Sequence, residues 1–345
     1  MLLNKHVIKI TTARWSLSLI SMLFLLVLVG LLVSMFIAIS FGAKDLTLET
    51  VWTAVTSYNS ELTTHQIIHE MRLPRVIGAA VVGAAFAVAG ALMQGVTRNP
   101  LADAGILGIN AGATFVVALS FAFFPNLTYS SLMVLSFLGA VLSTLLIFLL
   151  GSRATGGLTP LRLTIAGAVV AAFLHSLSSG IAIYYDLSQD LAFWYAGGVS
   201  GVRWSHLKIL VPVILIAILF AFLLGRSVSL LSLGDEVADN LGAHTKRIRL
   251  FGMALAVLLA GVSVSAVGSI GFVGLVIPHI SRKLVGVTYR LIIPMSALLG
   301  AILLVLADLG ARTINPPREL AIGVMVALVG VPFFLYLARK EGRSL

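Results

Sequence analysis

The sequence predicts an all-α, polytopic membrane protein with about ten transmembrane helices and almost no water-soluble body. Two observations of composition lead to this class: 59% of the 345 residues are hydrophobic and only 10% are charged, whereas soluble domains carry about 25% charged residues. The third observation is that the apolar residues gather in long runs separated by short polar segments. We therefore expect one transmembrane domain over residues 1–345.

Ten apolar runs define the predicted spans. Most approach the roughly 20 residues that a helix needs to cross the hydrocarbon, and only helices satisfy their backbone groups within a single segment there. The first run follows Lys5, Lys9 and Arg14 and exceeds the core of a signal peptide, so we expect a retained helix. The spans are 15–40, 74–96, 104–124, 130–151, 162–185, 207–225, 248–268, 271–287, 291–311 and 320–337.

The distribution of positive charge predicts the orientation. With a cytoplasmic start and ten crossings, more than twice as many of the 23 Lys and Arg residues fall on the inner side as on the outer side. Because positive charge favours the cytoplasmic side, we expect both termini in the cytoplasm. The spans are also rich in Gly and Ala, as at 78–85, which predicts closely packed helices.

A few polar residues enter the spans and could carry function. Asp308 lies one turn before Arg312, which favours a local ion pair. His175 and His279 could carry protons in a secondary transporter, although hydrogen-bonded structural roles are commoner.

Two further histidines lie outside the predicted spans. His65 and His69 are four residues apart, a spacing that suits a metal on a helix, but no third ligand lies nearby. We therefore expect solvated surface there and no metal site.

Motifs for catalysis and for direct ATP binding are absent from the sequence. There is no G-x-x-x-x-G-K-[ST] phosphate loop, no H-E-x-x-H and no G-x-S-x-G. The chain has no Cys, which excludes disulfides and thiolate chemistry. The net charge of +10 comes from cations between apolar runs, so we expect no nucleic-acid partner. A non-enzymatic conduit without a cofactor follows, driven by an ion gradient or by a partner protein.

The inner loop at about 229–245 predicts a short cytoplasmic helix. Ser232 followed by Asp235 resembles a capping box, and Gly242 is placed to end the helix. Val237 and Leu241 then share one side. Because so short a helix is unstable alone, it must dock on its own bundle or on a separate protein.

Three stretches of the chain resemble the FecCD family of binding-protein-dependent ABC import permeases, which take up iron-siderophores, haem and cobalamin. The match follows the order of the family over nearly the whole chain. The first stretch contains RLPR at 72–75, GALMQ at 90–94, NPLA at 99–102 and LG at 107–108; the second is LGDEVA at 233–238 with LG at 241–242; the third is GSIGFVGLVIPHISR at 268–282 with AD at 307–308 and ELAIG at 319–323.

The resemblance implies a type II ABC importer permease in a bacterial cell membrane. Such permeases pair with a second permease, as a homodimer or heterodimer, so that the path lies between them. The resemblance makes the short inner helix a coupling helix that docks on one of two cytoplasmic ATP-binding subunits. The implied coupling residues are Leu233, Gly234, Asp235, Glu236, Val237, Ala238, Leu241 and Gly242.

On the outer side, the resemblance implies docking of an extracytoplasmic substrate-binding protein. Arg72, Arg75 and Arg312 match family positions that meet acidic residues of that protein. The alternative is that these arginines pair with carboxylates of their own chain, such as Glu70 and Asp308.

The implied cytoplasmic gate lies before the fifth span, at Thr159, Pro160 and Leu161, where the last two residues depart from the polar character of the family. Ferric siderophores are the preferred cargo, ahead of haem and cobalamin. A proton-coupled secondary transporter that uses Asp308 or His279 is the competing class.

Overall fold

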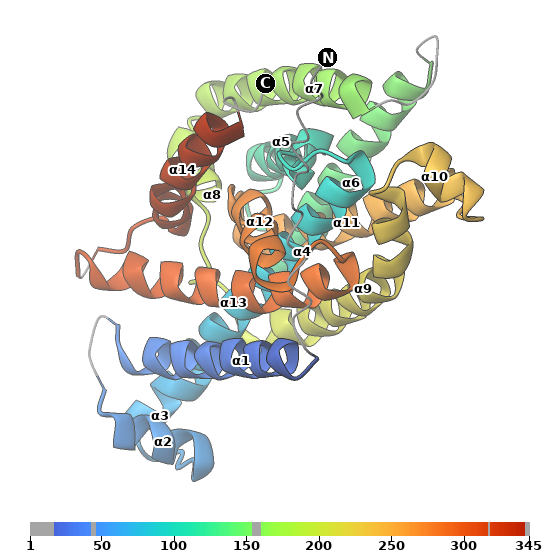
Figure 1. Ribbon diagram of the computed structural model, residues 1–345. Coiled ribbons are helices and arrows are strands. Elements are labelled where there is room, and N and C mark those ends of the chain that lie inside the picture. Colours follow the sequence, from blue (N-terminus) through green and yellow to red (C-terminus); the bar gives the residue numbers. More distant parts are fainter. Residues whose placement is uncertain (1–16, 43–45, 154–159, 317, 342–345) are drawn as a thin grey trace.

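The computed structural model describes residues 17–42, 46–153, 160–316 and 318–341, and every regular element in this part of the chain is helical (Figure 1). The helices are α1 (Leu17–Ser40), α2 (Leu48–Thr56), α3 (Thr63–Ile67), α4 (Leu73–Thr97), α5 (Ile109–Phe123), α6 (Tyr129–Arg153), α7 (Pro160–Tyr184), α8 (Ser188–Ala196), α9 (Trp204–Leu231), α10 (Asp235–Asn240), α11 (Thr245–Val267), α12 (Val273–Val285), α13 (Tyr289–Thr313) and α14 (Ile322–Glu341). A π turn, η1 (Ile68–Arg72), precedes α4, and a 3-10 turn, η2 (Ala104–Leu107), precedes α5.

Each of the ten predicted spans overlaps one of these helices. Seven helices of the described chain are long and apolar enough to cross a membrane, and α5 and α14 contain shorter apolar helices. The run predicted at 271–287 is only the 13-residue α12, which at about 1.5 Å per residue is too short to cross roughly 30 Å of hydrocarbon. The span at 207–225 was predicted too short, because α9 extends over 28 residues.

Helix α4 forms the centre of the bundle. Within the helical stretch Thr63–Thr97, 83% of the most apolar 18-residue segment is buried inside the bundle. The corresponding buried share is 22% for α1 and 22% for α7. Its glycines allow neighbouring backbones to approach: a Cβ added at Gly83 would overlap the carbonyl oxygen of Gly300 on α13, and one at Gly90 would overlap Gly274 on α12. Lipid gives no hydrophobic drive for helices to associate, so close packing through small residues takes its place. The prediction of closely packed helices is therefore confirmed.

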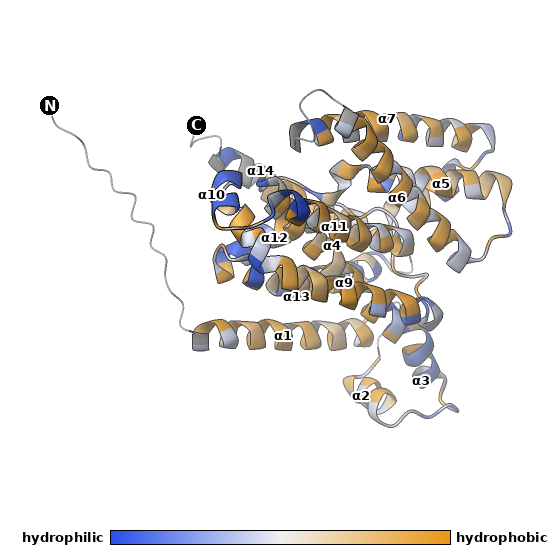
Figure 2. Cartoon of the chain, turned by 90° about the vertical axis from the view of Figure 1, so that its right-hand side faces the viewer, coloured by the Kyte–Doolittle hydropathy of each residue, from blue (hydrophilic) through white to orange (hydrophobic). Residues whose placement is uncertain are grey.

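The outer surface of the bundle is apolar along its length and polar at its ends. Helices α1, α7 and α9 expose large apolar side chains such as Leu26, Val169 and Phe220. Figure 2 shows hydrophobic residues along the bundle, with hydrophilic residues gathered near α10 at one end and near α3 at the other. This pattern suits a bundle surrounded by lipid, with its functional segments at the two ends.

Candidate functional sites at the two ends of the bundle

At the end of the bundle that the sequence predicts to face the cytoplasm, called the inner end below, α10 begins at a glycine rather than at a capping side chain. Gly234 is the N-cap residue with φ +118° and makes no side-chain cap bond. Ser232 instead donates its Oγ hydrogen bond to the carbonyl oxygen of Ser229 at 2.7 Å. The predicted capping box of Ser232 and Asp235 is therefore wrong, because Ser232 completes the end of α9.

The C-terminal end of α10 is the one predicted. Gly242 has φ +79°, a conformation that glycine adopts without strain. Its N–H donates to the carbonyl oxygen of Asp239 at 2.9 Å, and the N–H of Ala243 donates to that of Ala238 at 2.9 Å. This pair of bonds is a Schellman motif, so the helix ends in a defined turn.

Residues 233–242, which the family resemblance predicts to be a coupling element and which are called the coupling segment below, present an apolar face with no cover in the described chain. Leu233, Val237 and Leu241 are 62%, 46% and 61% exposed, whereas Ala238 is fully buried. The acidic side chain of Glu236 is also exposed. A helix of six residues with exposed apolar side chains beyond the membrane spans is a surface suited to another protein.

Arg249 on α11 connects the coupling segment to the central helix. Its Nη2 contacts both carboxylate oxygens of Asp235, at 2.9 and 3.2 Å. Its Nε donates to the carbonyl oxygen of Val96, in the last turn of α4, at 3.2 Å. No local spacing in the sequence indicates this connection, because the three residues come from three separate helices.

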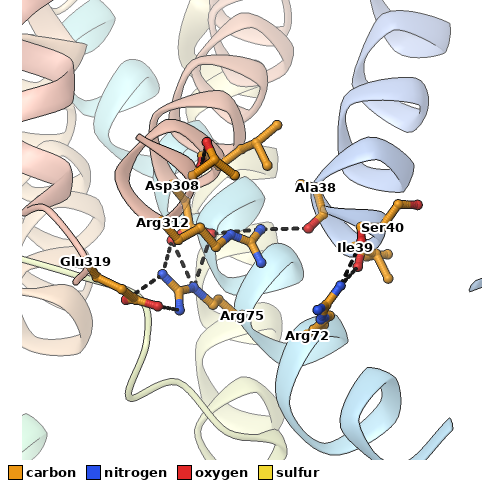
Figure 3. A network of polar contacts seen from close by, with 10 residues as sticks. Ala38, Ile39, Ser40, Arg72, Arg75, Asp308, Arg312 and Glu319 are labelled. Atoms are coloured by element: carbon orange, nitrogen blue, oxygen red, sulfur yellow. Dashed lines mark hydrogen bonds and ion pairs between the residues drawn. The ribbon is translucent and has the colours of Figure 1, made fainter. Parts of the chain in front are cut away.

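At the opposite end, predicted to face outward and called the outer end below, two carboxylates and two arginines form an ion-pair network, and a third arginine, Arg72, lies beside it (Figure 3). The guanidinium of Arg75 contacts Asp308 on α13 at 2.8 Å and Glu319, in the segment before α14, at 2.8 Å. Arg312 contacts the other oxygen of Asp308 at 3.2 Å. The predicted pair of Asp308 and Arg312 is confirmed, and Asp308 also serves Arg75. Glu319 was missed, since nothing in its sequence neighbourhood shows that the segment folds back onto α4.

The same arginines also hold the end of α1. Arg72 donates from Nη1 to the carbonyl oxygens of Ile39 and Ser40, at 2.6 and 2.9 Å. Arg312 donates from Nη2 to the carbonyl oxygen of Ala38 at 2.7 Å. The last carbonyl groups of a helix lack intrahelical partners and attract cations, so these two arginines attach α1 to α4 and α13.

Pro74 determines the local geometry that aims Arg72. Proline has no N–H to donate one turn back, and the chain before it forms the π turn Ile68–Arg72, in which the N–H of Leu73 donates to the carbonyl oxygen of Ile68. Arg72 is the last residue of this turn and is buried. Single π turns within helices are frequent at functional sites.

A cavity of about 350 Å³ opens beside the outer network. Its lining includes Arg72, Arg75, Arg203, Arg312 and Glu319. Four arginines and one carboxylate give the cavity an excess of positive charge. The excess remains when the negative charge of the neighbouring Asp308 is included. Arg72 and Arg312 are only 8% and 5% exposed, whereas Arg203 is exposed. The exposed guanidinium of Arg203 is therefore the more accessible cation of the set, and it was not among the predicted docking residues.

The histidines near the outer end have structural partners. His65 is buried, and its Nδ1 accepts the N–H of Asn59 at 3.1 Å, so the prediction of solvated surface is wrong there. The ring of His69 lies 4.3 Å from that of Tyr58 between centroids. Among the described residues, no group of three His, Asp or Glu side chains is arranged to hold a metal ion.

The remaining predicted residues lie within or beside the spans. Thr159 lies outside the described residues, and the side chains of Pro160 and Leu161 at the start of α7 lie outside them as well. His175 contacts the hydroxyl of Tyr195 at 2.8 Å. The ring of His279 packs edge-on against Phe333, with 5.6 Å between centroids.

Comparisons with known proteins agree with this architecture. The sequence pattern of the FecCD transport family matches residues 16–340. The chain is 51% identical over 310 residues to the iron(3+)-hydroxamate import system permease protein FhuB of Bacillus subtilis (strain 168), covering 90% of this chain and 81% of that protein. It is 42% identical over 309 residues to the iron-uptake system permease protein FeuB of the same organism, covering 90% of this chain and 92% of that protein.

A solved structure has the same fold. It is described as an inward-facing conformation of a metal-chelate type ABC transporter. The two chains superpose with a TM-score of 0.82 at 28% identity, covering 93% of this chain and 99% of the other.

Proposed function

Because the chain belongs to the FecCD transport family, we propose that it is the membrane-spanning permease subunit of an ATP-driven, binding-protein-dependent importer, without catalytic activity of its own. Its partners are a second permease subunit, two cytoplasmic ATP-binding subunits and an extracytoplasmic substrate-binding protein. Both termini lie in the cytoplasm. The observation that carries the proposal is the coupling segment, an exposed apolar and acidic helix that is joined by one arginine to the core of the bundle.

The coupling segment receives work from an ATP-binding subunit. Its exposed Leu233, Val237 and Leu241 fit an apolar groove on that partner. When the ATP-binding subunits close, displacement of α10 reaches α4 through Arg249, which contacts both Asp235 and the carbonyl group of Val96. Since α4 lies at the centre of the bundle, its movement alters the packing of the helices around it.

The cavity beside the outer network receives the substrate-binding protein. Its excess of arginine attracts acidic side chains and orients their approach. Arg75 and Arg312 set this potential from partly or fully buried positions, while Arg72 contributes from the π turn. The exposed Arg203 extends the positive surface toward the partner.

Ferric siderophores of the hydroxamate class are the proposed cargo. The support is the 51% identity to a permease that is named for iron(3+)-hydroxamate import. That identity extends over 90% of this chain.

A proton-coupled secondary transporter is the second candidate, and the network argues against it. A proton carrier must release and bind protons in turn, but Asp308 is 1% exposed in its side chain and contacts two arginines at 2.8 and 3.2 Å. Asp308 is thereby fixed as an ion-pair partner.

The experiment is uptake of a labelled ferric hydroxamate by vesicles that contain the whole complex. Val237→Asp places a charge on the apolar face of α10 and is expected to abolish uptake driven by ATP. Val55→Asp is the matched control, because Val55 is 48% exposed, as Val237 is 46% exposed, but lies on α2 at the outer end. Uptake that persists without ATP-binding subunits, or that stops when the proton gradient is collapsed at constant ATP, contradicts the proposal.

A further inference from the structure

Helix α7 exposes polar side chains at a depth where lipid does not favour them. Between Leu163 and Tyr185 the chain has no Asp, Glu, Lys or Arg, and His175 is its one residue of ionisable type apart from tyrosine. His175 and the hydroxyl-bearing Ser176 are nevertheless exposed on the bundle surface. His175 follows the first residue of α7 by about 22 Å of helix rise, well inside the span. Ionisable groups at such depth face a bundle interior or a water-filled cavity rather than lipid.

His175 borders a cavity of about 320 Å³ between α5, α7 and α8. The polar side chains of its lining are those of Asn110, His175 and Tyr195. The hydroxyl of Tyr195 lies 2.8 Å from Nδ1 of His175, and the two rings meet edge to face at 5.3 Å between centroids. This contact occupies one ring nitrogen of His175.

At Gly105 and Gly108, which line the cavity, the backbone is a 3-10 turn that ends in a left-handed residue rather than a continuous α-helix. Ser143 and Thr144, in the middle of α6, donate hydrogen bonds to the carbonyl oxygens of Gly108 and Leu107 at 2.8 and 3.1 Å. Gly108 has φ +69° and separates η2 from α5. Irregular backbone at membrane depth occurs where it is buried in protein or lines a polar cavity, and interrupted helices mark binding sites in transporters.

Asn110 leaves polar groups directed to this cavity. In the part of the chain that the structure describes, its backbone carbonyl accepts the hydroxyl of Thr114, while its side-chain amide has no hydrogen-bond partner. The amide lies beside Gly105, whose added Cβ would be 3.8 Å from Nδ2. Asn110 and Gly105 both line the cavity. An amide is a donor and an acceptor at once, so it is ready for a ligand that carries both kinds of group.

We propose that Asn110, His175 and Tyr195 form a contact site for the iron chelate on its way through the membrane, selective for chelates without net charge. This inference rests on the proposed function. A ferric complex of three hydroxamates is neutral and presents carbonyl and amide groups, whereas a complex of three catecholates keeps a large negative charge. Neutral hydrogen-bonding groups match the first, and the absence of Lys and Arg from the lining leaves the second without compensation.

The test measures uptake by the intact complex as a function of ferric hydroxamate concentration. Tyr195→Phe removes the hydroxyl and keeps the ring, and Asn110→Leu removes the amide at similar volume. Each is expected to raise the apparent KM about fivefold to tenfold, the effect of one lost hydrogen bond to a ligand. Tyr184→Phe is the matched control, because Tyr184 is on α7 and 82% exposed but does not line the cavity.

A charge substitution tests the selectivity itself. His175→Arg is expected to raise uptake of an anionic tris-catecholate relative to the neutral hydroxamate by about tenfold or more, because a cation in a low-dielectric site favours an anion. A merely structural contact of His175 and Tyr195 predicts equal losses for both chelates.

Several outcomes overturn the proposal. One is a KM for Tyr195→Phe equal to that of Tyr184→Phe. Another is loss of the second permease subunit from the purified complex of Tyr195→Phe or Asn110→Leu, because that loss would assign this face to subunit packing. Failure of the proposed function appears differently, since the unaltered complex would then show no uptake linked to ATP. Normal uptake by that complex together with unaltered KM values in the variants rejects the contact site alone.

Discussion

The two ends of this bundle use charged residues in opposite ways. At the outer end, Asp308 is 1% exposed in its side chain and contacts Arg75 and Arg312, which are 13% and 4% exposed. At the inner end, Asp235 is 43% exposed, and among the described residues its ion-pair partner is Arg249, which is 23% exposed. The buried network joins α1, α4, α13 and the segment before α14, whereas the inner pair holds a helix of six residues.

The contrast in burial indicates which end of the transporter is rigid and which end can be displaced. Buried ion pairs are costly to break because each partner is left without solvent, so the outer network fixes the relative positions of the helices that it joins. Partly exposed pairs contribute little and exchange readily with water. Under the proposed function, the inner pair would transmit displacement without making α10 rigid, and the outer end would stay fixed while α10 moves.

The largest expected effect comes from Asp308→Ala. The substitution leaves the guanidinium groups of Arg75 and Arg312 buried with one carboxylate, Glu319, for both. Removing one partner of a buried pair costs about 3–5 kcal/mol. We expect the free energy of unfolding of the purified protein in lipid nanodiscs to fall by that amount, which is measured as a lower unfolding temperature. We also expect less of the variant to accumulate in the membrane.

At the inner end, the substitution that corresponds to Asp308→Ala is Asp235→Ala. Asp235→Ala removes the carboxylate of a partly exposed pair, for which the expected cost is below about 1 kcal/mol. Equal destabilisation by the two substitutions would show that burial does not distinguish the two ends, and the comparison would then be abandoned.

The second prediction concerns transmission rather than stability. Arg249→Gln removes the ion pair with Asp235 and weakens the contact with Val96. We expect uptake per ATP hydrolysed to fall about tenfold, equivalent to ~1.4 kcal/mol of lost coupling, with the unfolding temperature nearly unchanged. The check is simultaneous measurement of uptake and ATP hydrolysis in the reconstituted complex.

The control for this prediction is Lys246→Gln. Lys246 is exposed on the same turn of α11, so the substitution removes an equal charge from the inner surface. If both variants lose uptake equally, surface charge is responsible and Arg249 has no special role in coupling.

Much of the fold followed from the sequence, because lipid imposes rules that composition reveals. Apolar runs had to be helices, and their small residues had to permit close packing, as the contact of Gly83 with Gly300 shows. The end of α10 at Gly242 followed from local chemistry alone. Its beginning did not, because Ser232 had a competing acceptor in the preceding helix at Ser229.

The candidate sites were predictable in residue type more than in geometry. The resemblance to a family indicated the arginines, but not that Arg72 and Arg312 hold the end of α1. Glu319 and Arg249 escaped notice because their partners lie on other helices. Pairings over long sequence separations depend on how helices cross, which the pattern of a single helix does not contain.

A smaller effect is expected at the end of the coupling helix. Gly242→Ala forces a side chain into a backbone conformation with φ +79°, although no atom lies within 4 Å of the added Cβ. The strain is about 1–2 kcal/mol. Because α10 is short, we expect this cost to loosen α10 locally, seen as faster amide hydrogen exchange at residues 238–243, with little change in global unfolding. Global destabilisation would mean that α10 is part of the rigid bundle.

The smallest effect is a dependence of the outer network on acid. Hydrogen bonding to Arg75 lowers the pKa of Glu319 below its usual range, so the charged carboxylate stabilises the folded state. That contribution is complete above the ordinary pKa of about 4.3 and is lost as the pH falls through the lowered pKa. Because the Glu319 side chain is 43% exposed, solvent limits the contribution to less than about 1 kcal/mol.

Glu319→Gln separates this contribution from that of Asp308. The amide keeps a hydrogen bond to Arg75 without a titrating group, so the variant is expected to unfold with a flatter dependence on pH below 4.3. At neutral pH it is expected to lose less than about 1 kcal/mol. The measurement is the unfolding temperature from about pH 3 to about pH 7, a range that includes the ordinary carboxyl pKa. If the unfolding temperature of the variant kept the same dependence on pH, a group other than Glu319 would be titrating. If the variant lost as much free energy of unfolding as Asp308→Ala, the exposed edge of the network would be bound as strongly as its buried centre.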